Sequence, residues 1–287
     1  MRAVVAVLLL VTAVHAGLWA LLEEKQQAPD FSGLLQSVSY DPHEGTGAPD
    51  ASTVASPERI RADMKTLSRL TRAIRLYSST GGMEIVPPLA AEAGLKVTLG
   101  VWIDKDPDRN EREIQSAITL ARRNSNVIGI VVGNETILTA TQKVDELIEK
   151  IKRVKKSVNV PVTTGDVWNT WRDNPELAAN VDFIAAHVLP YWEFFTDEQA
   201  VDQAVDRYQL LKKQFTGKRI MIAEFGWPSQ GYSRSEGGRG PAVPGPFRQA
   251  KVIRNFLAQA ASIGMEYNIV EAIDQPWKYF EGGVGPY

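Results

Sequence analysis

The sequence contains no cysteine and only three histidines among its 287 residues. Without cysteine, the chain can form neither disulfides nor thiolate metal sites. The histidines, His15, His43 and His187, lie too far apart along the chain to suggest a metal-binding cluster. We therefore expect a mechanism that uses no metal and no cofactor.

The sequence also lacks an excess of charge of either sign. It has 32 basic and 34 acidic residues, which gives a net charge of −2. The short basic tract at 152–156 fits the exposed face of a helix. A nucleic-acid partner is therefore not expected. With 44% hydrophobic residues, the chain can form a large globular domain with a sizeable core.

A long hydrophobic run occupies residues 3–22, directly behind Arg2. Its length is just enough for a helix to cross a bilayer. Residues 14–16 read Val-His-Ala, which resembles the small-residue site where signal peptides are cleaved. The run is apolar all round, so a core helix is less favoured than a membrane anchor or a signal peptide. We expect the rest of the chain to work at the periplasmic or extracellular face, membrane-anchored or secreted.

A rhythm of strands and helices follows a short polar linker. Apolar runs typical of strands end near Ser39, Tyr77, Val101, Gly133, Thr164, His187, Glu224 and Ile273. Between most of them lie helical patterns, such as 111–123, where apolar residues recur at spacings of three and four. Eight such repeats predict a (β/α)₈ barrel over residues 31–287, with residues 1–30 as anchor or signal peptide plus linker. An open doubly wound sheet is the alternative, but no glycine-rich phosphate motif follows the first strand.

The end of the chain leaves no room for an eighth helix, since only 14 residues follow Ile273. We expect that the sequence is a fragment of a longer protein and lacks the last helix of the barrel.

Tryptophan is concentrated at one end of the predicted barrel. Six of the seven tryptophans follow predicted strands: Trp102, Trp168, Trp171, Trp192, Trp227 and Trp277. The carboxyl ends of barrel strands carry the chemistry in this fold. Tryptophan offers a large apolar face and a hydrogen-bonding edge, which suit a sugar ring. Any one of these residues could be loop packing, but the set indicates a carbohydrate cleft.

Two glutamates end strands on opposite sides of the predicted barrel. Glu135 follows the fourth strand in VVGNETI, and Glu224 ends the seventh in IAEFGWPSQG. Each alone could form a salt bridge. Together, two acids that face each other across a sugar cleft are what glycoside cleavage requires. For a mechanism that retains anomeric configuration, we expect the carboxyl groups to lie roughly 5 Å apart. Repulsion between them is expected to raise the pKa of the one that donates a proton.

Five motifs resemble those of the family 17 glycoside hydrolases, the β-1,3-glucanase group. In chain order they are RLY at 75–77, VGNE at 132–135, LPY at 189–191, AEFGWPS at 223–229 and DQPWK at 274–278. The resemblance runs from about Leu35 to Lys278, nearly the whole part of the chain that follows the hydrophobic run.

The resemblance implies a retaining barrel enzyme that acts on β-glucan oligosaccharides or polysaccharides. It implies that Glu135 is the acid/base, that Glu224 is the nucleophile and that Asn134 hydrogen-bonds the sugar 2-hydroxyl. Lys278 matches a lysine that lines the catalytic centre. Further residues at or near strand ends are expected to bind substrate: Tyr40, Arg75, Tyr77, Trp168, His187, Tyr191 and Trp227.

Two positions depart from the family pattern. Leu189 replaces the first tyrosine of a Tyr-Pro-Tyr motif, and Gln275 replaces an acidic residue. The hydrophobic N-terminus and the early end look more like bacterial membrane-associated glucanosyltransferases. The sequence thus predicts β-1,3-glucan cleavage with transfer to water or to a glucan acceptor, the latter forming β-1,6 or β-1,3 links in periplasmic glucan synthesis. The alternatives are a non-catalytic glucan-binding domain of a larger glucan synthase and a barrel enzyme for a phosphorylated substrate.

Overall fold

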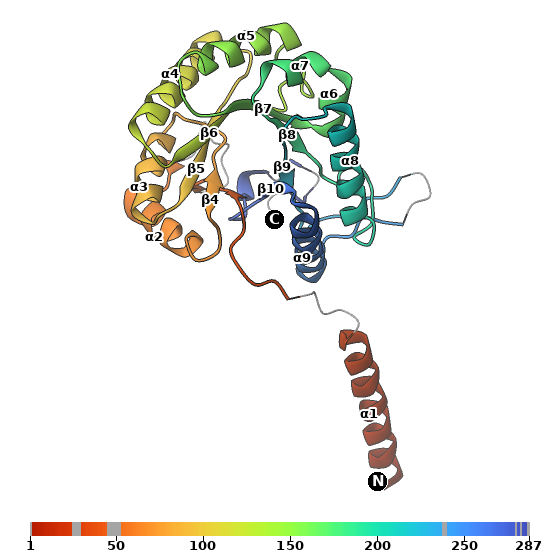
Figure 1. Ribbon diagram of the computed structural model, residues 1–287. Coiled ribbons are helices and arrows are strands. Elements are labelled where there is room, and N and C mark those ends of the chain that lie inside the picture. The colour runs from red at the N-terminus through yellow and green to blue at the C-terminus, as the bar shows by residue number, and fades with distance from the viewer. Residues whose placement is uncertain are drawn as a thin grey trace.

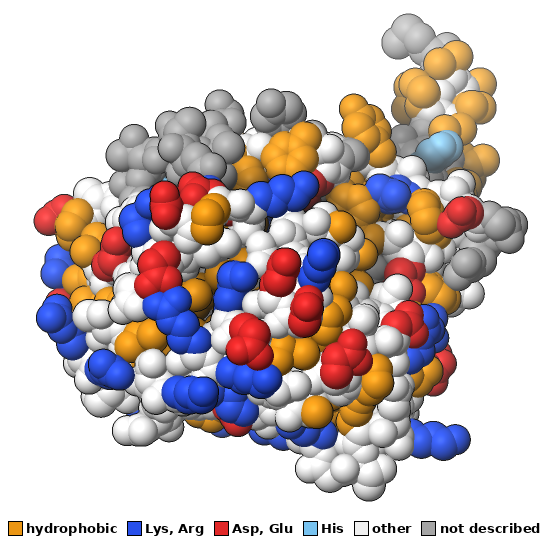
Figure 2. All heavy atoms as spheres, turned by 90° about the horizontal axis from the view of Figure 1, so that it is seen from above, with side chains coloured by type: hydrophobic (Ala, Val, Ile, Leu, Met, Phe, Trp, Pro, Cys, Tyr) orange, Lys and Arg blue, Asp and Glu red, His pale blue; other side chains and the backbone are white. Residues whose placement is uncertain are grey.

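The structure, a computed structural model, describes residues 2–24, 30–44, 53–236, 240–278, 280–281 and 283–285. The expected N-terminal apolar helix is α1 (Arg2–Glu24), which Figure 1 shows apart from the rest of the molecule. Its residues 2–21 are long and apolar enough to cross a membrane, and none is buried. In Figure 2 hydrophobic side chains cover this projecting helix, whereas acidic and basic side chains are interspersed over the visible face of the barrel.

Within the described residues, eight parallel strands close into a barrel, which confirms the predicted (β/α)₈ fold (Figure 1). In chain order they are β1 (Val38–Ser39), β4 (Ala73–Arg75), β5 (Lys96–Val101), β6 (Val127–Asn134), β7 (Val162–Val167), β8 (Ile184–His187), β9 (Ile220–Phe225) and β10 (Glu266–Ile269). Each pairs with its sequence neighbours in this series, and β10 closes the barrel against β1. A small antiparallel pair, β2 (His43–Glu44) and β3 (Thr53–Val54), follows β1.

Helices surround the barrel and cover the outer face of the strands (Figure 1). They are α2 (Pro57–Leu67), α3 (Val86–Glu92), α4 (Pro107–Arg123), α5 (Val144–Lys155), α6 (Trp168–Asp173), α7 (Pro175–Asn180), α8 (Ala200–Gln214) and α9 (Pro246–Ile263), with 3₁₀ turns η1 (Met83–Ile85) and η2 (Pro276–Lys278). The predicted helix at 111–123 is the greater part of α4. Asp106 caps this helix by accepting hydrogen bonds from the amides of Asp108 and Arg109.

A series of hydrogen bonds between polar side chains runs through the barrel interior to Glu224. Ser37 donates to Asn268 at 2.6 Å, and the Asn268 amide donates to Ser39 at 2.9 Å. Ser39 contacts the hydroxyl of Tyr77 at 2.9 Å, and Tyr77 donates to Glu224 at 3.1 Å. Since buried polar groups need partners, this series of hydrogen bonds fixes the side chains that lead to the mouth of the barrel.

The last strand ends earlier than the sequence pattern indicates. β10 ends at Ile269, not near Ile273, and its register against β9 shifts between Tyr267 and Ile269. The backbone still bonds to its neighbours beyond this point, with the amide of Ala272 donating to the carbonyl of Ser39 at 2.9 Å. Glu271 therefore lies at the barrel mouth and not within a strand.

Gly100 marks a tight approach of β5 to the segment after β4. A Cβ atom there would lie 2.3 Å from the Tyr77 carbonyl carbon and 2.4 Å from the Leu76 oxygen. We expect Gly100→Ala to lower the free energy of unfolding by about 1–3 kcal/mol, because backbone must shift to admit the methyl group. Gly129→Ala in β6 is the matched control, since its nearest atom would be 3.5 Å away.

Urea unfolding of both variants measures the difference. Equal midpoints for Gly100→Ala and the parent would show that β4 and β5 do not approach as closely as described.

Candidate active site

Glu135 and Glu224 meet at the mouth of the barrel. Glu135 follows β6, and Glu224 lies near the end of β9. A carboxylate oxygen of Glu135 lies within 4.8 Å of one of Glu224. This separation agrees with the expected value and with a retaining geometry, not with the wider spacing that inversion needs.

The backbone of Glu135 adopts an unusual conformation. Its φ of 51° lies in the left-handed region, which costs a non-glycine residue about 1–2 kcal/mol. The Glu135 amide donates to the carbonyl of Gly165 on β7 at 2.8 Å, and this bond helps to hold the turn. Strain of this kind persists at sites where the side chain must be aimed.

Arg75 is a buried cation that contacts both sides of the site. It is 2% exposed at the end of β4. Its Nη1 donates to Glu224 at 2.9 Å and to the carbonyl of Ala223 at 2.8 Å. Its Nη2 donates to Asn134 at 2.8 Å. The guanidinium thus pairs with the ionised form of Glu224 and sets the orientation of the Asn134 amide.

His187 joins Arg75 to the other glutamate. The side chain is fully buried at the end of β8, and its Nδ1 lies 2.8 Å from Glu135. Its Nε2 lies 3.4 Å and 3.5 Å from the two terminal nitrogens of Arg75. Because arginine can only donate, Nε2 is assigned as the acceptor, and Nδ1 carries the proton that it donates to Glu135.

The charge state of Glu135 differs from the expectation. Burial raises the pKa of Glu135, but the hydrogen bond from His187, the electrostatic interaction with that side chain and the positive charges of Arg75 and Lys278 outweigh it, so the net pKa is lowered. The prediction of a raised pKa was therefore wrong for the unliganded protein, because it did not include the effects of His187, Arg75 and Lys278. The carboxyl is ionised near neutrality until a ligand changes its surroundings.

A third acid, Glu271, was missed by the sequence analysis. Its Oε2 accepts a hydrogen bond from Lys278 at 3.1 Å, and its Oε1 is buried without a hydrogen-bond partner among the described residues. Burial raises the pKa of Glu271 to about 7, with further increases from Asp41 and Glu224 and an opposing effect of Lys278. The signal in the sequence is an acid directly after the apolar run YNIV, hidden because that strand was extended to Ile273.

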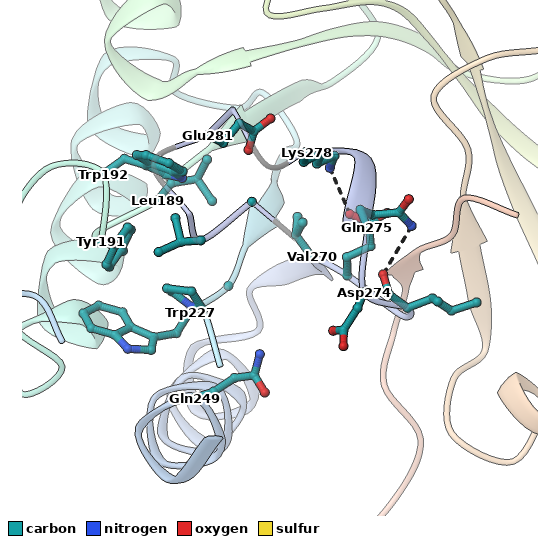
Figure 3. Close-up of a pocket in the computed structure, with 16 residues that line it drawn as sticks. Leu189, Tyr191, Trp192, Trp227, Gln249, Val270, Asp274, Gln275, Lys278 and Glu281 are labelled. Carbon is teal, nitrogen blue, oxygen red and sulfur yellow. Dashed lines mark hydrogen bonds and ion pairs between the residues drawn. The ribbon is translucent and has the colours of Figure 1, made fainter. Parts of the chain in front are cut away.

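A cavity of about 120 Å³ lies among the segments that follow β8, β9 and β10, and Glu271 and Lys278 line it, whereas Glu135 and Glu224 do not. In Figure 3 the aromatic side chains of Tyr191, Trp192 and Trp227 stand on one side of it, and Gln275 and Lys278 stand on the other. An apolar wall that faces polar groups suits a sugar ring with its hydroxyl rim.

The indole of Trp227 is 2% exposed and donates to the carbonyl of Val243 at 3.0 Å. The Tyr191 ring meets it edge to face, with ring centres 5.7 Å apart. These two residues therefore form a rigid wall of the cavity.

Two predicted sugar contacts lie elsewhere. Tyr40 is fully buried, and its hydroxyl donates to Asp63 on α2 at 2.9 Å, away from the two glutamates. The ring of Trp168 is 9% exposed, with the Arg207 guanidinium 4.0 Å from its centre. Neither ring lines the cavity that Tyr191 and Trp227 border.

The six tryptophans at the strand ends do not all line one cleft. Trp171 is fully buried, and its indole donates to the carbonyl of Ala185 at 3.0 Å, so it is a core residue. A residue's position after a strand predicts at which end of the barrel it lies. It does not predict whether the ring turns inward to the cleft or outward to the helices.

Among the described residues, Glu135, His187 and Glu224 form a group that could hold a metal ion by distance alone. The Arg75 guanidinium bonds Glu224 and contacts His187 at the same place. Its positive charge opposes a second cation there.

Comparison with known proteins gives a consistent family. The family model of the BtgE/BtgC glycoside hydrolase domain matches residues 37–287. A probable glucan endo-1,3-beta-glucosidase btgC of Aspergillus terreus is 28% identical over 276 residues, which cover 87% of this chain and 42% of that protein. The glucan endo-1,3-beta-glucosidase btgC of Emericella nidulans is 26% identical, with 78% and 38% covered. The chain thus spans less than half the length of these curated relatives.

Solved structures share the fold. A glycoside hydrolase family 17 beta-1,3-glucanosyltransferase of Rhizomucor miehei has a TM-score of 0.75 at 23% identity, covering 88% of this chain and 91% of that one. An endo-laminarinase from Formosa has a TM-score of 0.74 at 20% identity, covering 88% and 82%.

The raised pKa of Glu271 predicts a pH-dependent stability. Its pKa is about 7 in the folded protein against an ordinary 4.5, so between these values the unfolded chain binds fewer protons. The free energy of unfolding of the parent should therefore fall as pH rises through this window, by up to about 3 kcal/mol. Glu271→Gln cannot ionise and should lack this decline. Urea unfolding of both proteins at several pH values measures it, and parallel curves would contradict the assignment.

Proposed function

This chain belongs to the family of BtgE/BtgC glycoside hydrolase domains, and from that premise we propose that it is a retaining enzyme that cleaves β-1,3-glucan. The observation that carries the proposal is the approach of the Glu135 and Glu224 carboxylates to within 4.8 Å at the end of the barrel where catalysis occurs. The names of the fungal relatives and of the structural neighbours support β-1,3-glucan as the substrate.

In the proposed reaction, Glu224 is the nucleophile. Arg75 and Tyr77 donate hydrogen bonds to its carboxylate and hold its orientation. One of its oxygens attacks the anomeric carbon, the glycosidic bond breaks, and the leaving oxygen takes a proton from Glu135. An acceptor hydroxyl then gives its proton to Glu135, and its oxygen attacks the anomeric carbon and releases Glu224.

Glu135 must gain a proton before it can act as the acid. A sugar that fills the cleft excludes water from Glu135 and strengthens the burial that raises its pKa. Protonation is therefore coupled to donor binding, and His187 remains as the partner of the neutral carboxyl.

The predicted binding residues divide into two groups. Asn134, Tyr77, Tyr191, Trp227 and Lys278 lie at the mouth of the barrel or along the cavity and are proposed to face the sugar. Arg75 and His187 are buried below the acids and are proposed to hold them in place without contacting the sugar.

The acceptor in the second half-reaction is water or a glucan hydroxyl. A transferase and a laminarinase share the fold, so the fold is compatible with both outcomes. Transfer would form β-1,6 or β-1,3 links. A non-catalytic glucan-binding domain is not favoured, because both carboxylates keep their hydrogen-bond partners.

We also propose the arrangement of the chain in the cell. Residues 1–30 would act as a membrane anchor or signal peptide, supported by the apolar helix α1. The barrel of residues 31–287 would then work on the periplasmic or extracellular side.

Incubation with β-1,3-glucan oligosaccharides that carry a label at the reducing end tests the proposed cleavage activity. We expect products shorter than the substrate, together with longer ones if a glucan hydroxyl is the acceptor. Mass spectrometry gives their length, and methylation analysis gives the linkage. Unchanged oligosaccharides that nevertheless bind would instead support the binding-domain alternative.

Variants of the two glutamates separate their roles. Glu224→Ala should form no glycosyl-enzyme with any donor. Glu135→Ala should lose at least about 100-fold in kcat/KM on glucan, the usual scale of general acid catalysis. A glucosyl fluoride oligomer has a leaving group that needs no proton. With this donor, the kcat/KM of Glu135→Ala should stay within about tenfold of that of the parent, and azide should increase the turnover of the variant. Activity of Glu224→Ala, but not of Glu135→Ala, on the fluoride donor would reverse the assignment.

A further inference from the structure

Lys278 lies among four carboxyl groups at the edge of the cavity. Its ammonium donates to Glu271, and its charge also interacts with Glu281, Glu224 and Glu135. Burial lowers the pKa of Lys278, but the negative charges of Glu271, Glu281 and Glu224 outweigh it and raise the net pKa. The side chain is therefore a permanent cation whose position depends on which carboxylate holds it.

Glu271 and Lys278 depend on each other. In the part of the chain that the structure describes, the Lys278 ammonium hydrogen-bonds only to Glu271, and Glu271 accepts only from Lys278. The side chain of Lys278 is 19% exposed, and that of Glu271 is 11% exposed. A buried carboxylate with one unpartnered oxygen is costly, so this pair is not explained by stability alone.

The nucleophile already has its own partners. Glu224 accepts from Arg75 at 2.9 Å and from Tyr77 at 3.1 Å. A further cation on Glu224 would stabilise its ionised ground state more than a transition state in which that charge is lost to the sugar, and so would slow the attack.

We infer that Glu271 is a positioning residue that holds the Lys278 ammonium at the wall of the cavity and keeps it off Glu224. The inference rests on the proposed function, because it assigns Glu271 a part in the same reaction. Lys278 has three N–H donors, of which Glu271 takes one. The others are left for a sugar hydroxyl in the cavity that both residues line.

Charged and titratable groups face Glu271 from several elements. They are Lys278 on η2, Glu224 on β9, Asp41 after β1 and Tyr77 after β4. Loss of the Glu271 charge would leave Lys278 drawn toward Glu224, Glu281 and Glu135. In the parent, the Lys278 ammonium would be released from Glu271 in the same way when Glu271 takes up a proton.

A double-mutant cycle tests whether Glu271 acts through Lys278. Glu271→Gln keeps the shape and removes the charge, and we expect it to lower kcat/KM on β-1,3-glucan by about tenfold to a hundredfold, as for a small misplacement beside reacting atoms. Lys278→Met should also lose activity, and the double variant should be no less active than Lys278→Met alone. Glu271→Asp, which restores the charge, should recover part of the loss.

The matched control is Glu266→Gln. Glu266 begins β10, the strand that precedes Glu271, at the opposite end of the barrel, and it pairs with Arg219 on the surface. This variant should retain parental activity. Parental activity of Glu271→Gln, or a double variant much weaker than Lys278→Met, would overturn the inference.

A second measurement needs no glucan. In protein labelled with ¹³C and ¹⁵N at lysine, the Lys278 side-chain signal is identified by its loss in Lys278→Arg. It should shift with pH around the Glu271 pKa of about 7 in the parent, and this step should vanish in Glu271→Gln. If parent and variants leave β-1,3-glucan unchanged, the proposed function fails, while this signal still decides whether Glu271 holds Lys278. A signal that does not respond to Glu271→Gln overturns the inference.

Discussion

The guanidinium of Arg75 is the interaction on which the rest of the site depends. It bonds Glu224, the carbonyl of Ala223 and Asn134, and it contacts His187, which in turn bonds Glu135. A buried cation is tolerated only where its donors and charge are matched, and removing one partner of such a pair typically costs about 3–5 kcal/mol. The two glutamates are therefore held through one side chain that is itself almost inaccessible to a substrate.

This arrangement explains why the two acids differ although they lie close together. Glu224 accepts hydrogen bonds from the buried guanidinium of Arg75 and from the hydroxyl of Tyr77. Glu135 is more exposed, with 24% of its side chain accessible against 9% for Glu224, and its bond from His187 opposes its burial. A sugar that covers Glu135 would therefore change the surroundings of its carboxyl more than those of the Glu224 carboxyl. The asymmetry needed for acid and nucleophile follows from exposure and not from distance.

The barrel and both glutamates could be predicted because they depend on local patterns. The apolar strands, the helical spacing and an acid at each of two opposite strand ends are visible in the sequence. The roles of Arg75 and His187 could not be predicted, because a position at the end of a strand suggests contact with substrate and does not reveal that the side chain is buried. Tyr40 and Trp168 were predicted to bind substrate for the same reason, and both are buried. Glu271 was missed because the strand was expected to continue to Ile273, whereas β10 ends at Ile269. Where a strand ends depends on its pairing with the neighbouring strands, which the apolar residues after Ile269 do not indicate.

The two departures from the family pattern have different physical meanings. Gln275 is 2% exposed, and its amide donates to the carbonyls of Asp41 and Ile273 while its oxygen accepts from Trp277 at 2.8 Å. An ionised carboxylate could not donate to either carbonyl, and it would add another negative charge near Lys278. A neutral amide therefore fits this position better than an acid does.

Leu189 instead lines the cavity directly, where a tyrosine would present a hydroxyl. The polar framework around the acids is thus retained, and the altered surface lies along the cavity wall. In the proposed reaction the acids perform the same steps with any acceptor. A preference for water or for a glucan hydroxyl would then come from surfaces such as this wall, which bind the acceptor and not the reacting bond.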